Sequence, residues 1–127
     1  MQENYLFEYA VIRIVPRVER EEFINSGVIL FCARKKFLKC LCVVNEKRLE
    51  VFTNDTDFKE LREHLKSFAD ICSGSKAAGP IASLDIASRF RWLTATRSTV
   101  IQSSKVHPGF CEDPDETLQK LFSQMVE

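Results

Sequence analysis

LFEYAVIRIV (Leu6–Val15) is the stretch of sequence that decides the fold. It is rich in Val, Ile, Tyr and Phe, which indicates a β-strand. Side chains alternate between the two faces of a strand, and both sets are largely apolar here. We therefore expect a central strand that is covered on both sides. Pro16 ends it, because proline has no N–H to donate to a sheet.

Two more apolar runs follow, at residues 27–33 and 37–44, and the short basic stretch between them predicts a hairpin. Asn25-Ser26-Gly27 predicts a tight turn before the first run, since Asn and Gly tolerate positive φ. Residues 18–25 are a charged connection with the character of a helical turn. Residues 48–52 are a candidate for a short fourth strand.

The second half of the chain predicts helices. Apolar side chains recur at three- and four-residue steps over residues 55–72, as in an amphipathic helix. Asp113, Pro114 and Glu116 form a capping-box pattern that starts a second helix over 114–126. The remaining expectations are a short helix within 83–93, a strand over 98–102 and a loop over 105–109.

This order of elements predicts an α+β fold, with a mainly antiparallel sheet of about 4–5 strands and two main helices packed on it. We expect the 127 residues to form a single domain. Its parts are a strand-rich part (5–53), a helix (55–72), an Arg/Trp segment (83–110) and a C-terminal helix (114–126).

Composition limits the function classes. The 18 basic and 18 acidic residues cancel, so nucleic acid is a disfavoured partner. No apolar run is long enough to span a membrane and no leader pattern is present, which predicts a cytoplasmic protein. The five cysteines lack Cys-x-x-Cys spacing, so we expect reduced core thiols and no metal site, with Cys40 and Cys42 on one strand face.

Arg13, Arg17 and Arg20 are candidate ligands for an anion, because guanidinium groups fit phosphate and carboxylate. The alternative for the last two is ion pairing with the acidic residues of the same stretch. Arg13 lies mid-strand among apolar neighbours, so a carboxylate partner such as Glu8 or Glu22 is expected for it.

The Arg/Trp segment carries the second set of candidates, Arg89, Arg91, Arg97 and Ser98. Guanidinium groups, a hydroxyl and backbone N–H groups together can hold an anion. The alternative is structural, with an arginine stacked on Trp92 or bonded to loop carbonyls as a clamp.

His107 is the one histidine near this segment and the weak candidate for a catalytic acid or base. No spacing of nucleophile, base and orienting group accompanies it, so we favour a non-enzymatic protein. The sequence indicates no particular cofactor.

Several strings, spread over nearly the whole chain, carry a resemblance to a known family: YAVIR (9–13), PRVEREEF (16–23), RFRWL (89–93) and RSTVIQ (97–102). With them the chain resembles the uncharacterised bacterial family called domain of unknown function 3037. The resemblance implies a bacterial protein and, as a partner, a HipA-like kinase encoded nearby. It implies no mechanism.

Three functional hypotheses remain. The leading one is an accessory or interaction domain whose arginine-lined surface binds an acidic partner or a phosphate-bearing small molecule. The second is an enzyme that acts on a nucleotide or phosphorylated substrate. The third is a nucleic-acid-binding module in which Phe90 and Trp92 stack on bases.

Overall fold

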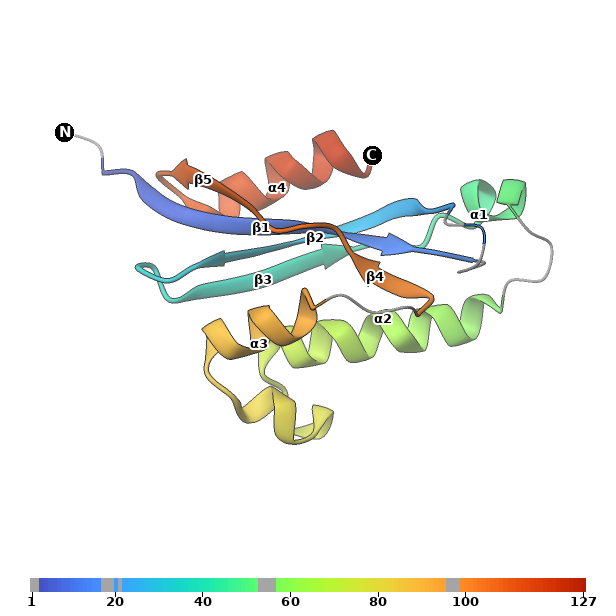
Figure 1. Ribbon diagram of the computed structural model, residues 1–127, viewed down its shortest axis with the longest axis horizontal. Coiled ribbons are helices and arrows are strands. Elements are labelled where there is room, and N and C mark those ends of the chain that lie inside the picture. Colours follow the sequence, from blue (N-terminus) through green and yellow to red (C-terminus); the bar gives the residue numbers. More distant parts are fainter. Residues whose placement is uncertain (1–2, 17–19, 21, 53–56, 96–98) are drawn as a thin grey trace.

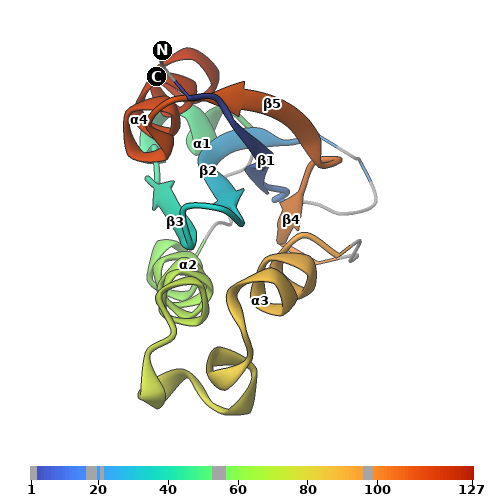
Figure 2. The same ribbon diagram turned by 90° about the vertical axis from the view of Figure 1, so that its left-hand side faces the viewer.

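A five-stranded antiparallel sheet lies between helices in the computed structural model, which describes residues 3–16, 20, 22–52, 57–95 and 99–127 (Figure 1). The helices α2 and α3 cover one face, and α4 covers the other (Figure 2). The predicted α+β class is confirmed. The strands are β1 (Tyr5–Ile14), β2 (Ile24–Cys32), β3 (Phe37–Cys42), β4 (Ile101–Ser103) and β5 (His107–Cys111), and the helices are α1 (Glu46–Phe52), α2 (Phe58–Ser73), α3 (Ile86–Leu93) and α4 (Pro114–Met125).

β1 is the central strand, as its apolar faces predicted. It pairs with β2 along one side, and β2 continues to β3. Along its other side it pairs first with β5 and then with β4. Its Ala10, Ile12 and Ile14 pack under α2 and α3, while Phe7 packs with Leu118 of α4.

Ser104 fills the junction between β4 and β5. Its N–H donates to the carbonyl of Val11 at 2.8 Å, and its side-chain Oγ accepts from the N–H of Val11, also at 2.8 Å. The side chain is only 6% exposed, so water has little access to this pair. The hydroxyl thus takes the place of a backbone acceptor at the point where the pairing of β1 passes from β5 to β4.

Replacing Ser104 with alanine should therefore lower the free energy of unfolding by about 1–3 kcal/mol, because the buried N–H of Val11 loses its acceptor. Urea denaturation followed by circular dichroism measures the loss. Ser73→Ala is the control, since that hydroxyl is exposed at the end of α2, and it should cost less than about 0.5 kcal/mol. Equal losses for the two variants would contradict this role of Ser104.

The helix α4 begins as its sequence predicted, whereas α2 begins at Phe58, later than the expected residue 55, which lies outside the described residues. Asp57 precedes α2 and accepts from the N–H of Glu60 at 3.1 Å, and Gly74 ends the helix with a left-handed φ of 77°. Asp113 accepts from the N–H groups of Asp115 and Glu116, and Pro114 takes the first turn of α4. The short helix expected within 83–93 is α3, which begins at Ile86.

The prediction of a strand over 48–52 is wrong, because this segment belongs to the helix α1. The side chain of Asn45 accepts from the N–H of Arg48 at 3.1 Å and starts the helix. Leu49 is fully buried while Val51 is 84% exposed. A single apolar anchor fits helix and strand periodicity equally well, so pattern alone did not separate them.

The loop expected over 105–109 is also wrong, because β5 covers most of it. Pro108 is tolerated there since β5 is an edge strand, where a missing N–H costs no ladder bond. The strand expected over 98–102 is shorter and later, and runs from Ile101 to Ser103 as β4. Residues 96–98 lie outside the described part of the chain.

The tight turn expected at Asn25-Ser26-Gly27 is wrong as well, since all three residues lie within β2. Gly27 is needed because the backbone of β3 approaches it closely. A Cβ on it would lie 2.5 Å from the carbonyl oxygen of Leu41 and 2.9 Å from Sγ of Cys42, both in β3. Of residues 18–25, three lie outside the described residues, and β2 begins at Ile24.

No helix formed by the described residues is long and apolar enough to cross a membrane.

Candidate functional site

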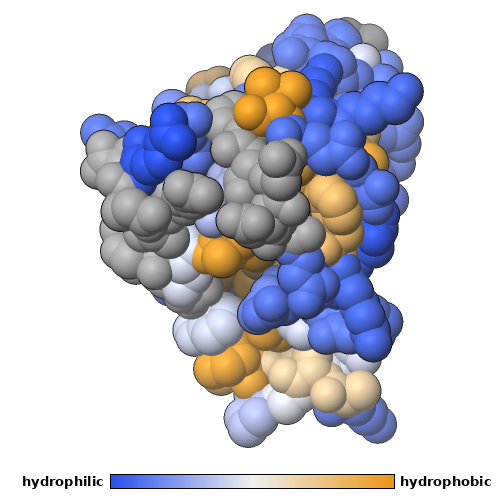
Figure 3. All heavy atoms as spheres, turned by 90° about the vertical axis from the view of Figure 1, so that its right-hand side faces the viewer, coloured by the Kyte–Doolittle hydropathy of each residue, from blue (hydrophilic) through white to orange (hydrophobic). Residues whose placement is uncertain are grey.

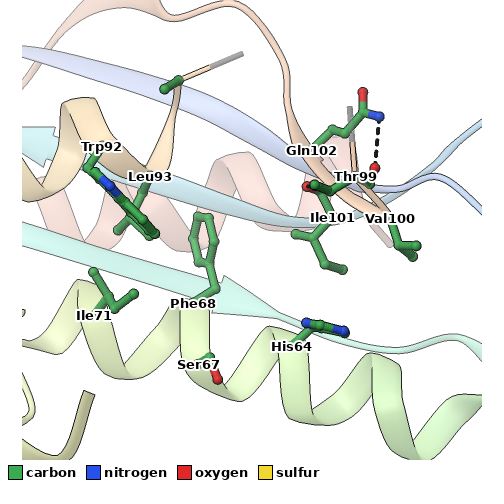
Figure 4. Close-up of a pocket in the computed structure, with 11 residues that line it drawn as sticks. His64, Ser67, Phe68, Ile71, Trp92, Leu93, Thr99, Val100, Ile101 and Gln102 are labelled. Atoms are coloured by element: carbon green, nitrogen blue, oxygen red, sulfur yellow. Dashed lines mark hydrogen bonds between the residues drawn. The ribbon is translucent and has the colours of Figure 1, made fainter. Parts of the chain in front are cut away.

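A groove of about 630 Å³ lies between α2, α3 and the β4 segment. Figure 4 shows the side chains that converge on it from these three elements. We call it the α2–α3–β4 groove. It is lined by His64, Ser67, Phe68, Ile71, Trp92, Leu93, Ala95, Thr99, Val100, Ile101 and Gln102.

The wall from α2 follows from the pitch of that helix. Ser67 and Ile71 are one turn apart, as are His64 and Phe68, so all four side chains reach the same side. Phe68 is 9% exposed and forms the floor, whereas His64 and Ser67 are exposed on the rim. Nε2 of His64 lies 3.5 Å from a carboxylate oxygen of Glu60, one turn earlier.

The wall from α3 depends on how that short helix is fixed. The carboxylate of Asp85 accepts from the N–H of Ser88 at 3.4 Å. Hydrogen bonding from the side chain of Ser88, and to a smaller extent from its backbone, lowers the pKa of Asp85. Phe90 and Leu93 bury themselves against the sheet. Trp92 then projects toward Ile71 and Phe68 across the groove (Figure 4) and stays 38% exposed.

The third wall is the entry to β4. Ile101 points toward Phe68, and Val100, 36% exposed, lies at the lip of the groove (Figure 4). Gln102 turns away and donates from Nε2 to the carbonyl of Thr99 at 2.8 Å. Seen from the end of the molecule, patches of apolar surface lie between polar and charged side chains (Figure 3).

The chemistry of the groove is therefore that of a binding surface. Its floor is aromatic and aliphatic, and its rim offers an imidazole and two hydroxyl groups. An apolar concavity with a few polar groups at its edge suits an organic ligand or an apolar side chain of another protein. The described residues form no group of three His, Cys, Asp or Glu side chains placed to hold a metal ion.

Arg89 occupies the structural role that the sequence left open for it. Its guanidinium donates to the carbonyl of Leu84 at 3.0 Å and to that of Ala82 at 3.3 Å. The same group lies against Gly74, where a Cβ would come within 2.9 Å of it. Arg89 thus holds the end of α2, the turn at Pro80–Ser83 and α3 together.

Arg13 lies on the other face of the sheet. Its guanidinium carbon is 4.1 Å from the ring centre of Phe23, which is a cation–π contact. Glu8 projects toward the face of α3, since its cross-strand partner is the buried Phe31, so it is not the expected carboxylate partner. Arg13 and Arg89 therefore share no common surface.

The other predicted ligands divide into two groups. Arg20 forms an ion pair with Glu22 at 2.7 Å, which is the local pairing kept open above. Arg91 is exposed on α3 next to Trp92. Arg17, Arg97 and Ser98 lie outside the described residues.

His107 lies away from the groove. It is exposed on β5, and its ring centre is 5.3 Å from that of Tyr9. Tyr9 packs with the apolar cluster under α4, on the sheet face opposite to the groove. His107 therefore takes no part in the chemistry of the α2–α3–β4 groove.

Sequence reasoning missed most of the groove. Phe68 belongs to the apolar stripe of the helix predicted over 55–72, which indicates a core position and gives no sign of a groove. The groove exists because α2, α3 and the β4 segment meet at one place, which no local motif records. The one available signal was Trp92, a large aromatic residue next to an arginine.

Residues 9–126 match a family model described as "Protein of unknown function (DUF3037)". The match spans nearly the whole chain and confirms the resemblance drawn from the sequence. No curated protein and no solved structure matches the chain.

Proposed function

The chain belongs to the DUF3037 family of proteins of unknown function, and we propose that it works as an interaction domain whose α2–α3–β4 groove receives an apolar segment of a partner protein. The observation that carries the proposal is the exposure of Trp92 and Val100 on opposite lips of one apolar groove. Covering such side chains on binding is favourable by about 25 cal/mol per Å² of apolar area.

The make-up of the groove supports a protein partner. Interface centres are enriched in aromatic and aliphatic groups, and their rims are polar. The groove repeats this order, with Phe68 and Ile71 inside and Ser67 and Thr99 at its edge. Tryptophan is also among the residues that contribute most to binding energy at interfaces.

Charge narrows the class of partner. Arg91 is exposed beside Trp92, and the chain carries an excess of cations between Asp85 and Phe110. A partner segment with an apolar anchor and flanking carboxylates complements this surface. In our proposal the protein is bacterial and cytoplasmic, and its partner is a HipA-like kinase encoded nearby, the partner that the family resemblance implies.

This proposal narrows the arginine-lined surface expected from the sequence. Three described arginines of that set already have partners within the chain. Arg89 donates hydrogen bonds to loop carbonyls, Arg20 forms an ion pair with Glu22, and Arg13 makes a cation–π contact with Phe23. In the proposal, Arg91 contacts an anionic group of the partner. It lies beside an apolar recognition surface and does not form part of an anion-binding pocket.

Val100→Glu should weaken binding of the kinase tenfold or more, about 1.4 kcal/mol, because it places a carboxylate in an apolar interface. The matched control is Val51→Glu, since that valine is 84% exposed on α1 and is not part of the groove. Calorimetry with the purified kinase measures both affinities. Equal binding by the two variants, or no complex with the wild-type chain, would overturn the proposal.

The size of the groove favours a second candidate function, binding of a small organic molecule such as a nucleotide. A volume of about 630 Å³ lies within the usual range for such ligands, roughly 300–1,000 Å³. Trp92 is the single tryptophan of the chain and lines the groove, so its fluorescence reports occupancy directly. Saturable quenching by a nucleotide, lost in Val100→Glu, would support this candidate over the kinase.

A further inference from the structure

Three thiols meet between β3 and α2. Cys40 and Cys42 are alternate residues of β3, so they project from the same face, as the sequence predicted. That face packs on α2, where Cys72 is 2% exposed in the last turn. The thiol of Cys40 is hydrogen-bonded to both of the others, and all three cysteines are free.

The hydrogen bonds distinguish the three sulfur atoms. S–H donation from Cys42 and Cys72 lowers the pKa of the Cys40 thiol, although burial opposes the shift. The same contact, together with burial, raises the pKa values of Cys42 and Cys72. Cys40 is therefore the sulfur that carries thiolate character, and the thiolate is the reactive form of cysteine.

The thiol cluster has an opening to solvent at Cys42. A shallow opening of about 450 Å³ between β3 and α2 is lined by Cys42 and by two cations, Arg62 and Lys66. Cys40 itself is partly exposed. An opening of this size admits a small oxidant to this edge of the cluster.

A second pair of cysteines provides a comparison within the same molecule. Cys32 and Cys111 are 0% and 5% exposed in the apolar cluster under α4. Burial raises the pKa of Cys111. Neither cysteine belongs to the thiol cluster between β3 and α2.

We propose that Cys40 and Cys72 form a thiol pair that a hydroperoxide oxidises to a reversible disulfide between β3 and α2. The proposal is independent of the function assigned to the α2–α3–β4 groove, because none of these cysteines lines it.

The reaction has two steps. The Cys40 thiolate attacks one peroxide oxygen, the O–O bond breaks, and the leaving hydroxide takes up a proton to become water, so that Cys40 becomes a sulfenic acid. The sulfur of Cys72 then attacks the sulfenic sulfur. The S–S bond forms, the S–O bond breaks, and hydroxide leaves as water with the proton of Cys72. Hydrogen peroxide gains two electrons, which the two thiols lose.

Cys72 is a better partner for Cys40 than Cys42 is. Residues two apart on one strand have Cα atoms about 6.6 Å apart, close to the upper limit of about 6.8 Å for a disulfide. A helix residue facing the strand is free of this constraint. Bridging to Cys72 requires only the side-chain contact that already exists.

The test is peptide mapping of the wild-type protein after treatment with hydrogen peroxide, with and without a dithiol reductant. We expect a Cys40–Cys72 disulfide that the reductant reverses and that forms at least roughly tenfold faster than any modification of Cys32 or Cys111. A disulfide confined to Cys40–Cys42 or Cys32–Cys111, or equal rates at all five cysteines, would overturn the proposal.

Two variants separate the steps. Cys72→Ala should stop the reaction at a Cys40 sulfenic acid, which dimedone traps. Cys42→Ser is the matched control, since serine keeps a hydrogen-bond donor beside Cys40, and it should still form the disulfide. Failure of Cys72→Ala to accumulate the dimedone adduct would count against Cys40 as the attacking sulfur.

Discussion

Phe90→Ala should lower the free energy of unfolding by about 3–5 kcal/mol, the usual range for removing a buried phenylalanine. The ring is 2% exposed, and its centre is 5.3 Å from that of Phe31 in the sheet. The helix that carries it, α3, has only eight residues and cannot persist without such an anchor.

The loss should extend to the groove, because α3 supplies Trp92 and Leu93 to its wall. We therefore expect Phe90→Ala to unfold at a lower urea concentration and to shift Trp92 emission toward that of a solvent-exposed indole. Arg91→Ala is the control on the same helix, with an exposed side chain and an expected change within about 0.5 kcal/mol. A loss below 1 kcal/mol for Phe90→Ala would mean that α3 is held mainly by other contacts.

Gly27→Ala should cost about 3 kcal/mol, at the upper end of overpacking losses. The added Cβ would meet the carbonyl oxygen of Leu41 at 2.5 Å, and a backbone atom cannot move unless β3 shifts with it. Six residue pairs join β2 to β3, so such a shift disturbs the whole edge of the sheet.

Gly109→Ala is the matched comparison for Gly27→Ala. Its Cβ would also come within 2.5 Å of another atom, but that atom is at the tip of the Phe7 ring, which can tilt aside. We expect this loss to be smaller, about 1–2 kcal/mol. Urea titrations of the two variants give the ranking, and a larger loss for Gly109→Ala would contradict the distinction between backbone and side-chain neighbours.

The parts of the fold that could be predicted from the sequence are those that repeat one signal over many residues. β1 has ten residues of apolar alternation, and α2 has four turns of stripe between Asp57 and Gly74. The α1 and β5 segments are short and carry mixed signals. Leu49 alone anchors α1, and Pro108 in β5 is acceptable only because that strand has a free edge.

The site was less predictable than the fold. The clamp made by Arg89 could be foreseen as an alternative, because a half-buried guanidinium requires carbonyl or carboxylate partners. The groove could not, since the distance between Phe68 and Trp92 along the chain says nothing about their meeting in space. Tertiary packing of α3 against α2 creates that site.

The position of β1 has a consequence for the newly made chain. Val11 leaves the ribosome 93 residues before Ser104, the residue to which it is hydrogen-bonded. At about 5–20 residues per second, synthesis of these 93 residues takes roughly 5–19 seconds, during which one side of β1 has no neighbouring strand. During translation this side is an unpaired template for other strands, so co-translational aggregation should begin there. A chaperone that covers the nascent N-terminal segment should raise the yield of folded protein.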